Sequence, residues 1–343
     1  MKPARLFSLI VLLLLALYGA VGFYFLPDAG FNGDLTRIGM LPERLFGWRK
    51  PQPAIDPKLM QQASWQDADV LVVGDSFSEG RVWQTVLTGH GLKVRTEDWG
   101  SIRAVCDDFE PWLKKQGFKG RFVIFEIVER NAGSIHASLA CKHMSPHSNA
   151  AAAAHRALPL TAFDPDKPDY SGRFSVGLRT AWNTRKYEQL SSRPGFHSMP
   201  LANGASVVRL TDGCKLFSHR RCQDVLFLTA NQSQDLNDGL LDDIRKLNTR
   251  LHMIKPLWVI APNKSTVYLY PHKQFWNKAE QQLGSPNLLR TFRAAVEAGT
   301  VDLYFGNNTH LSPTGYLLMG KVIYRSLEKD GLTAAAERPA NPG

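Results

Sequence analysis

An apolar run that ends abruptly in a polar turn constrains the fold of this chain more than any other feature. Residues 70–73 read Val-Leu-Val-Val, Gly74-Asp75-Ser76 follow at once, and the next residues are typical of a helix start. Uninterrupted apolar runs of this kind indicate strands that are buried on both faces, as in parallel sheets. We therefore expect an α/β fold in which Ser76 follows the carboxyl end of a strand, where such sheets place their reactive groups.

Ser76 is a candidate nucleophile, and His310 is its candidate base. A serine at a strand-to-helix turn would have backbone N–H groups and the helix dipole beside it, which favours developing negative charge. His310 stands just before a predicted helix start, with Ser312 as N-cap and Pro313 at the first helical position. The pair suggests acyl chemistry. From position alone, Ser76 could instead be a simple cap and His310 a hydrogen-bonded structural group.

Two short segments carry a family resemblance. Residues 74–78 (Gly-Asp-Ser-Phe-Ser) and 309–316 (Thr-His-Leu-Ser-Pro-Thr-Gly-Tyr) resemble the first and last blocks of the SGNH (GDSL-type) hydrolase superfamily. Residues 123–131 and 259–268 resemble segments of the alginate O-acetyltransferase group, periplasmic SGNH-like proteins that acetylate exported polysaccharides. The resemblance covers roughly residues 69–324 and implies a three-layer α/β/α fold with a mostly parallel sheet. In the alginate group an Asp-x-His element precedes the serine, whereas here the serine comes first, as in ordinary SGNH hydrolases.

The residue that would orient His310 departs from the family pattern. Family members carry an aspartate two or three residues before the histidine, but this chain has Asn308 and Asn307 there. The Asp-x-His spacing favours Asn308, whose side-chain oxygen could accept a hydrogen bond from the imidazole. Because asparagine offers no full negative charge, a site of this kind should be slower than one with aspartate. A degenerate, non-catalytic domain is the alternative. Asp302 is expected to begin a last strand over residues 301–305 and to point elsewhere.

The resemblance also implies an oxyanion hole and a substrate-binding region. The hole would combine the backbone N–H of Ser76 with Gly100 and Asn131. Read without the resemblance, Gly100 is a turn residue and Asn131 a strand-end cap. Arg130 and Lys264 are candidate substrate-binding cations, although Arg130 could instead pair with the neighbouring Glu129 and a lysine on a turn is commonly solvated.

The N-terminal segment predicts a membrane anchor. Residues 6–26 form an apolar stretch close to the ~20 residues that span a bilayer and longer than the ~7–15-residue core of a cleaved signal peptide. Lys2 and Arg5 precede it, and an aromatic group (residues 23–25) follows, which suits an interfacial belt. The positive-inside rule then leaves the N-terminus in the cytoplasm and the main domain outside the inner membrane of a bacterium. A cleaved signal peptide is the alternative.

The cysteines agree with export. The four form an even set, for which we expect two disulfides, and Cys214 with Cys222 would close a short loop and leave Cys106 with Cys141. Three pairings are possible in principle. Four histidines lie around Cys141 without a standard zinc spacing, so we expect no metal and no cofactor. They are His136, His143, His147 and His155.

The charge balance favours anionic surroundings without indicating nucleic acid. The formal net charge is +10 and the isoelectric point is about 9.5. The basic residues are scattered and no nucleic-acid-binding motif is present, so we expect no nucleic-acid partner. A basic surface suits an anionic membrane or an acidic polysaccharide.

The pattern of elements predicts the domain organisation. After the anchor (residues 1–26), residues 27–65 are expected to form a stalk with one short docking helix. A single SGNH-like catalytic domain would span 66–330, with an insertion or cap at 132–225, and residues 331–343 would be a disordered tail. Helices are expected over residues 236–251, 287–298 and 315–324, and a second strand over 92–96.

Two functions of different classes follow. The first is a membrane-anchored O-acetyltransferase that modifies sugar hydroxyls of an exported polysaccharide through an acyl-enzyme on Ser76, or an esterase or deacetylase if water is the acceptor. The resemblance implies a membrane-bound O-acyltransferase partner as acyl donor. The second is a non-catalytic polysaccharide-binding scaffold of a secretion complex.

Overall fold

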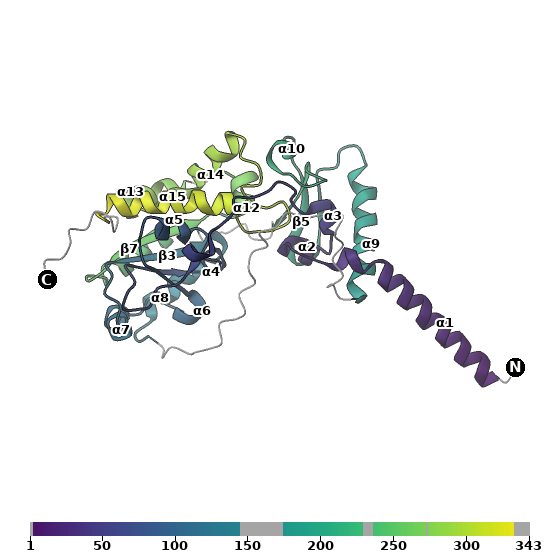
Figure 1. Ribbon diagram of the computed structural model, residues 1–343. Coiled ribbons are helices and arrows are strands. Elements are labelled where there is room, and N and C mark those ends of the chain that lie inside the picture. The colour runs from purple at the N-terminus through teal and green to yellow at the C-terminus, as the bar shows by residue number, and fades with distance from the viewer. Residues whose placement is uncertain (1–2, 145–173, 229–235, 272–273, 333–343) are drawn as a thin grey trace. The chain divides into compact units, whose positions relative to one another are not determined.

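The computed structural model describes residues 3–144, 174–228, 236–271 and 274–332 of the 343-residue chain (Figure 1). The chain forms two compact units. Unit 1 comprises residues 1–51, 161–230 and 304–309, and unit 2 comprises residues 52–160, 231–303 and 310–343. Each is described by itself.

A four-stranded parallel sheet forms the centre of unit 2. Its order is β2-β1-β3-β7, with bounds Val94–Asp98, Val70–Gly74, Phe122–Val128 and Lys255–Ala261. Every residue of β1 and β3 is buried, as the uninterrupted apolar runs predict for strands covered on both faces. Gly74 pairs with Asp98, and Val128 pairs with Ala261, so the residues after these strands start from one edge of the sheet. The predicted α/β class is confirmed.

Helices cover both faces of this sheet. In Figure 1, α5 and α13 to α15 lie on one face and α6 to α8 on the other. His90, at the end of α5, stacks on Tyr324 of α15 at 3.9 Å between ring centroids, while Phe109 of α7 contacts Phe125 of β3 at 5.7 Å. The bounds are η2 Pro57–Met60, α4 Ser76–Glu79, α5 Gln84–Gly89, α6 Trp99–Ile102, α7 Phe109–Gln116, η3 Glu129–His136, α8 Ala137–Ala140, α11 Asp238–Asn248, α12 Lys264–Tyr268, α13 Phe275–Leu283, α14 Leu288–Glu297 and α15 Pro313–Lys329.

Caps confirm two of the predicted helix starts of unit 2, whereas the helix predicted from residue 236 begins at Asp238. The side chain of Asn287 accepts a hydrogen bond from the Arg290 N–H at 3.0 Å at the start of α14. Ser312 accepts one from the Gly315 N–H at 3.2 Å, and Pro313 is the first residue of α15. The Ser312 cap fixes the start of α15, the helix that follows His310.

The strand predicted over residues 301–305 is wrong. Val301 and Asp302 form a turn, Leu303 a bend and Tyr304 an isolated bridge instead of a strand of the sheet, and Asp302 has a positive φ of 54° that interrupts an extended run. Aspartate tolerates this left-handed conformation better than most residues. The second strand also starts two residues later than predicted, at Val94.

Unit 1 contains a small antiparallel sheet that the sequence did not reveal. Its order is β4-β5-β6, with bounds Ser198–Pro200, Ala205–Arg209 and Asp224–Leu228. A hydrophobic cluster packs this sheet against α2, α3 and α9, and includes Leu35, Phe46, Tyr187, Val207 and Leu226. The other elements of unit 1 are α1 Pro3–Tyr24, η1 Leu26–Ala29, α2 Asp34–Gly39, α3 Glu43–Phe46, α9 Phe174–Ser191, η4 Ala202–Gly204 and α10 Gly213–Leu216. The predicted domain boundaries stay predictions.

Two features indicate an extracytoplasmic protein. The helix α1 is long and apolar enough to cross a membrane, with a mean hydropathy of 2.5 over its most apolar window, and it leaves most of its side chains exposed. Both predicted disulfides are present, Cys106–Cys141 in unit 2 and Cys214–Cys222 in unit 1. Disulfides persist in oxidising compartments outside the cytoplasm.

Candidate functional site

Ser76 and His310 lie in hydrogen-bonding contact within unit 2. The distance from Ser76 Oγ to His310 Nε2 is 2.9 Å, although 234 residues separate the two in sequence. Both side chains are half-buried, and the imidazole packs against the Phe77 ring at 5.1 Å between centroids. In the tautomer with its proton on Nδ1, Nε2 accepts the serine hydroxyl proton, which is the geometry of a nucleophile and its general base.

Asp75, rather than Ser76, caps the helix at this turn. Asp75 Oδ1 accepts the Phe77 N–H at 3.0 Å, and Oδ2 accepts the Val128 N–H at 2.8 Å, which ties the turn to the end of β3. Ser76 is the first residue of α4 and its hydroxyl is therefore available to His310. Since α4 has only four residues, its dipole is too small to carry the electrostatic role that we expected from a helix start.

A buried carboxyl group supports the turn from behind. Glu126 is fully buried in β3, and its Oε2 accepts the Ser78 hydroxyl at 2.7 Å and the Asp75 N–H at 3.2 Å. Burial, and then the charge of Asp75, raise the pKa of Glu126 well above its ordinary value. A Cβ on Gly74 would lie 2.3 Å from Ser78 Oγ, so this contact requires glycine. Sequence reasoning missed Glu126, whose signal is one carboxyl group inside an otherwise apolar strand.

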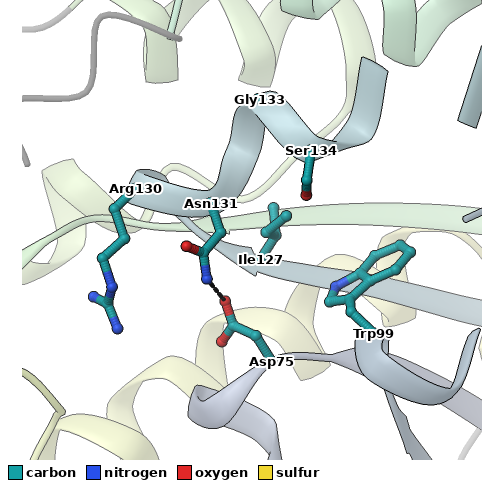
Figure 2. A pocket seen from close by; sticks show the side chains of 7 residues that line it. All are labelled: Asp75, Trp99, Ile127, Arg130, Asn131, Gly133 and Ser134. Atoms are coloured by element: carbon teal, nitrogen blue, oxygen red, sulfur yellow. Dashed lines mark hydrogen bonds between the residues drawn. The ribbon is translucent and has the colours of Figure 1, made fainter. Parts of the chain in front are cut away.

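A pocket of about 330 Å³ opens beside this turn, at the carboxyl edge of the sheet (Figure 2). The lining residues are Asp75, Trp99, Ile127, Arg130, Asn131, Gly133 and Ser134. In Figure 2 the Arg130 guanidinium and the Trp99 ring lie on opposite sides of Asp75. The Trp99 Nε1–H donates to the Glu126 carbonyl oxygen at 2.7 Å, which fixes the ring in the pocket wall.

The predicted oxyanion residues lie near this pocket. The Asn131 side chain is exposed, and its Nδ2 donates to Asp75 Oδ2 at 3.4 Å, as the dashed line in Figure 2 marks. Gly100 is an exposed residue of α6 that follows Trp99. The oxyanion role of the Ser76 N–H, Gly100 and Asn131 stays a prediction.

The two candidate substrate-binding cations have different surroundings. Arg130 lines the pocket, its Nη1 donates to Asn263 Oδ1 at 3.3 Å, and its guanidinium lies 5.7 Å from the Phe77 ring centroid. Lys264 begins α12, is only 3% exposed and does not line this pocket, so the solvated alternative for it is wrong. Glu129 is buried, and its Oε2 accepts the Asn263 N–H at 2.9 Å. Arg130 is thus the cation that a ligand in the pocket would meet.

The two asparagines before His310 are buried in unit 1. Asn307 Nδ2 donates to Glu43 Oε2 at 2.6 Å, which commits this amide to a structural contact. Asn308 is 4% exposed, and its backbone N–H donates to the Phe305 carbonyl at 3.3 Å. Its role as the residue that orients His310 stays a prediction.

Asp34 and Glu43 bind the loop at residues 307–309, and sequence reasoning missed both carboxylates. Asp34 Oδ1 accepts the Thr309 N–H at 2.8 Å, and Asp34 Oδ2 accepts the Thr309 hydroxyl. Glu43 accepts four hydrogen bonds, and burial raises its pKa above the ordinary value. No sequence signal marks the contacts with Asn307 and Thr309, since these residues lie more than 260 positions from Glu43 and Asp34.

Metal ligands do not gather in the described part of the chain, where no group of three or more His, Cys, Asp or Glu side chains could hold an ion. His136 pairs with Asp243 at 2.8 Å, and His143 pairs with Asp108 at 3.3 Å. The other two histidines near Cys141, His147 and His155, lie outside the described residues.

Comparisons with protein-family models, with curated proteins and with solved structures found no match to this chain. The case for a function therefore depends on the geometry of the site and on the sequence motifs.

Proposed function

We propose that this protein is a membrane-anchored, extracytoplasmic O-acetyltransferase that acetylates sugar hydroxyls of an exported polysaccharide through an acyl-enzyme on Ser76. The observation that carries the proposal is the 2.9 Å contact between Ser76 Oγ and His310 Nε2. The resemblance of residues 74–78 and 309–316 to the SGNH superfamily supports the same chemistry, and the parallel sheet with a polar carboxyl edge is compatible with it.

The first half of the reaction loads the enzyme. His310 Nε2 takes the proton of Ser76 as its Oγ attacks the acetyl carbonyl of the donor. The negative charge on the tetrahedral intermediate would be stabilised by the Ser76 N–H, Gly100 and Asn131. When the intermediate collapses, the imidazolium returns the proton to the leaving group and Ser76 keeps the acetyl group.

The second half transfers the acetyl group to the acceptor. A sugar hydroxyl attacks the acetyl carbonyl while His310 takes its proton, and the collapse of the second intermediate returns that proton to Ser76. The pocket beside Asp75 suits a sugar ring, since Trp99 offers an aromatic wall and Arg130 a cation for a carboxylate or hydroxyl. If water replaces the sugar, the same residues perform ester hydrolysis, and the half-buried Ser76 and His310 are open enough to admit it.

The location follows from α1 as an uncleaved anchor. Lys2 and Arg5 before the apolar helix favour a cytoplasmic N-terminus, which leaves unit 2 and the part of unit 1 that follows α1 in the periplasm, where the disulfides would form. Because acetyl-CoA is cytoplasmic, the donor would be supplied through a membrane-bound O-acyltransferase partner, as the family resemblance implies.

Ester turnover by the full chain in detergent tests the acyl-enzyme. With p-nitrophenyl acetate, we expect Ser76→Ala and His310→Ala each to reduce the rate by roughly 10³-fold or more, with the double variant no worse, because such residues act as a unit. Ser326→Ala and His136→Ala remove the same side-chain types away from the site and should keep the wild-type rate. Equal rates in all variants would reject the acyl-enzyme and favour the scaffold function.

An acceptor experiment then separates transferase from esterase. The acetylated enzyme is mixed with an acidic oligosaccharide, and the acetyl group is followed by mass spectrometry. Acetylated sugar in excess over free acetate would support the transferase, whereas acetate alone would indicate an esterase.

A further inference from the structure

The helix α9 (Phe174–Ser191) has an outer face that the proposed function does not use. Its inner face contributes buried side chains to unit 1, among them Thr184 and Tyr187. Five exposed residues recur at the spacing of one helix face, Leu178, Trp182, Arg185, Lys186 and Gln189, and Arg179 and Glu188 are exposed beside them. This outer face therefore joins apolar side chains at one end to cationic ones at the other.

Trp182 is unusual among the tryptophans of this protein. All eight lie in the described ranges, and Trp182 is the one that is exposed, with 70% of its surface accessible. Leu178, one turn earlier on the same face, is 48% exposed. A surface depression of about 350 Å³ is lined by Trp182, Arg185, Lys186 and Gln189. A large indole next to two cations on an open surface suggests a ligand that is apolar and anionic at once.

The outer face is continuous with the end of the apolar helix α1. Gly177 packs directly on the backbone after α1, since a Cβ there would lie 2.2 Å from the Phe25 carbonyl oxygen and 3.2 Å from the Leu26 nitrogen. Figure 1 shows α9 beside this end of α1. Phe23 and Tyr24 are 63% and 77% exposed at the same end, which suits the aromatic belt where a span leaves the bilayer.

The charges of α9 match an anionic surface. Arg179, Arg185 and Lys186 are all exposed. The acidic residue of the helix, Glu188, pairs with Arg221 at 3.5 Å. The cations are therefore not neutralised by the carboxylate of their own helix.

We propose that the outer face of α9 docks on the periplasmic surface of the membrane, with Leu178 and Trp182 among the lipid headgroups and chains and with Arg185 and Lys186 on anionic phospholipid headgroups. Tryptophan favours this interfacial zone, and basic residues beside it bind acidic lipids. The inference goes beyond the proposed acyl transfer and takes from it only the membrane anchor. It means that the part of unit 1 outside α1 lies against the bilayer instead of moving freely at the end of the anchor.

Quenching of Trp182 by brominated lipid tests this docking. The full chain is reconstituted in vesicles of phosphatidylcholine, alone or mixed with phosphatidylglycerol, with bromine atoms on the acyl chains close to the headgroups. The described helix α1 contains no tryptophan, so quenching reports the tryptophans outside the span. We expect a quenched component that is present in the wild type, lost in Trp182→Phe and larger with phosphatidylglycerol. Phenylalanine keeps the apolar contact while removing the fluorophore.

A double charge variant tests the headgroup contact. Each cation near an anionic bilayer strengthens binding roughly fivefold, so Arg185→Gln with Lys186→Gln should shift docking roughly 25-fold toward the undocked state in phosphatidylglycerol vesicles. Lys114→Gln with Lys115→Gln removes two exposed charges from α7 and should leave the quenching unchanged.

Three outcomes would overturn the proposal. Quenching that is the same in wild type and Trp182→Phe would show that the outer face does not reach lipid, as a protein- or glycan-binding surface would behave. Trp182 quenching that is equal with and without phosphatidylglycerol would reject the role of anionic headgroups. An equal effect of the α9 and α7 charge variants would show that only the net charge of the protein matters.

Discussion

Glu43 is the residue whose substitution we expect to be the most informative about stability, because one carboxyl group there satisfies four donors. Its Oε1 accepts the N–H groups of Asn32 and Gly33, at 2.9 and 2.8 Å, and the Thr36 hydroxyl, while Oε2 accepts Asn307 Nδ2 at 2.6 Å. The group joins the start of α2 to the loop at residues 304–309, both in unit 1.

The cost of Glu43→Ala follows from which donors lose their partner. The Thr36 hydroxyl keeps its hydrogen bond to the Gly33 carbonyl at 3.0 Å, and the N–H of the exposed residue Asn32 can bind water. The Gly33 N–H and Asn307 Nδ2 are buried and would be left unpaired, at about 1–3 kcal/mol each. We expect a loss of about 2–4 kcal/mol, the lower part of that sum, because alanine also removes a carboxylate whose charge is costly to bury.

Glu43→Gln separates hydrogen bonding from charge. Its amide oxygen can keep the three bonds of Oε1, and rotation of the Asn307 amide lets its oxygen accept from the new NH₂ group, so we expect a change within about 1 kcal/mol at pH 7. Burial raises the pKa of Glu43 in the folded state, so the folded protein binds more protons than the unfolded chain above pH 4.5. Glu43 therefore makes the wild type less stable as pH rises from 4.5 through the folded pKa, and Glu43→Gln should remove that slope.

Urea unfolding of the full chain in detergent, followed by circular dichroism from pH 5 to 8, measures both effects, and hydrogen exchange at residues 33–39 localises them. A loss below about 1 kcal/mol in Glu43→Ala would refute the network. A glutamine variant as unstable as the alanine variant would show that the negative charge, and not the set of acceptors, stabilises the loop.

Two further predictions concern stability elsewhere. Glu126 carries a pKa raised mainly by burial, so Glu126→Gln should flatten the fall in stability of the wild type above pH 4.5, and an unchanged slope in urea unfolding would contradict the raised pKa. The Cys106–Cys141 disulfide closes a separation of 35 residues and Cys214–Cys222 one of 8, so replacing the first pair by serine should cost about 4 kcal/mol and the second about 2.5 kcal/mol by loop entropy. The reverse order in thermal unfolding would show that strain or residual structure outweighs loop length.

Local signals in the sequence predicted the elements that carry the site. The apolar run before Gly74 predicted β1, and the Ser312-Pro313 start predicted α15. The even count of cysteines predicted two disulfides, and the short loop from Cys214 to Cys222 favoured the observed pairing among the three that are possible. The strand and the helix could be predicted because apolar patterning and helix capping involve residues that are close together in the sequence. The pairing of Ser76 with His310 was predicted from the places of both residues before helix starts and from the resemblance of their motifs, because no periodicity links residues 234 positions apart.

The contacts between distant parts of the sequence within unit 1 required the structure. Glu43 lies in a segment that its proline and glycine content marked as a stalk, yet it is buried by partners from residues 32–36 and 307. The strands β4, β5 and β6 are short and exposed in part, so their pattern is too weak to predict a sheet. The turn at Asp302 depends on a left-handed residue that reads as part of an apolar strand in the sequence.

The proton chemistry that we propose for Ser76 passes through the imidazole and not through the carboxyl groups of the same turn. Both carboxylate oxygens of Asp75 accept backbone N–H groups. The bond from Phe77 caps α4, and the bond from Val128 ties the turn to β3. Glu126 contacts Ser78 rather than Ser76, and burial keeps it protonated to a higher pH than an ordinary carboxyl group. These two groups therefore shape the turn, and His310 Nε2, at 2.9 Å, is the atom placed to act as the base.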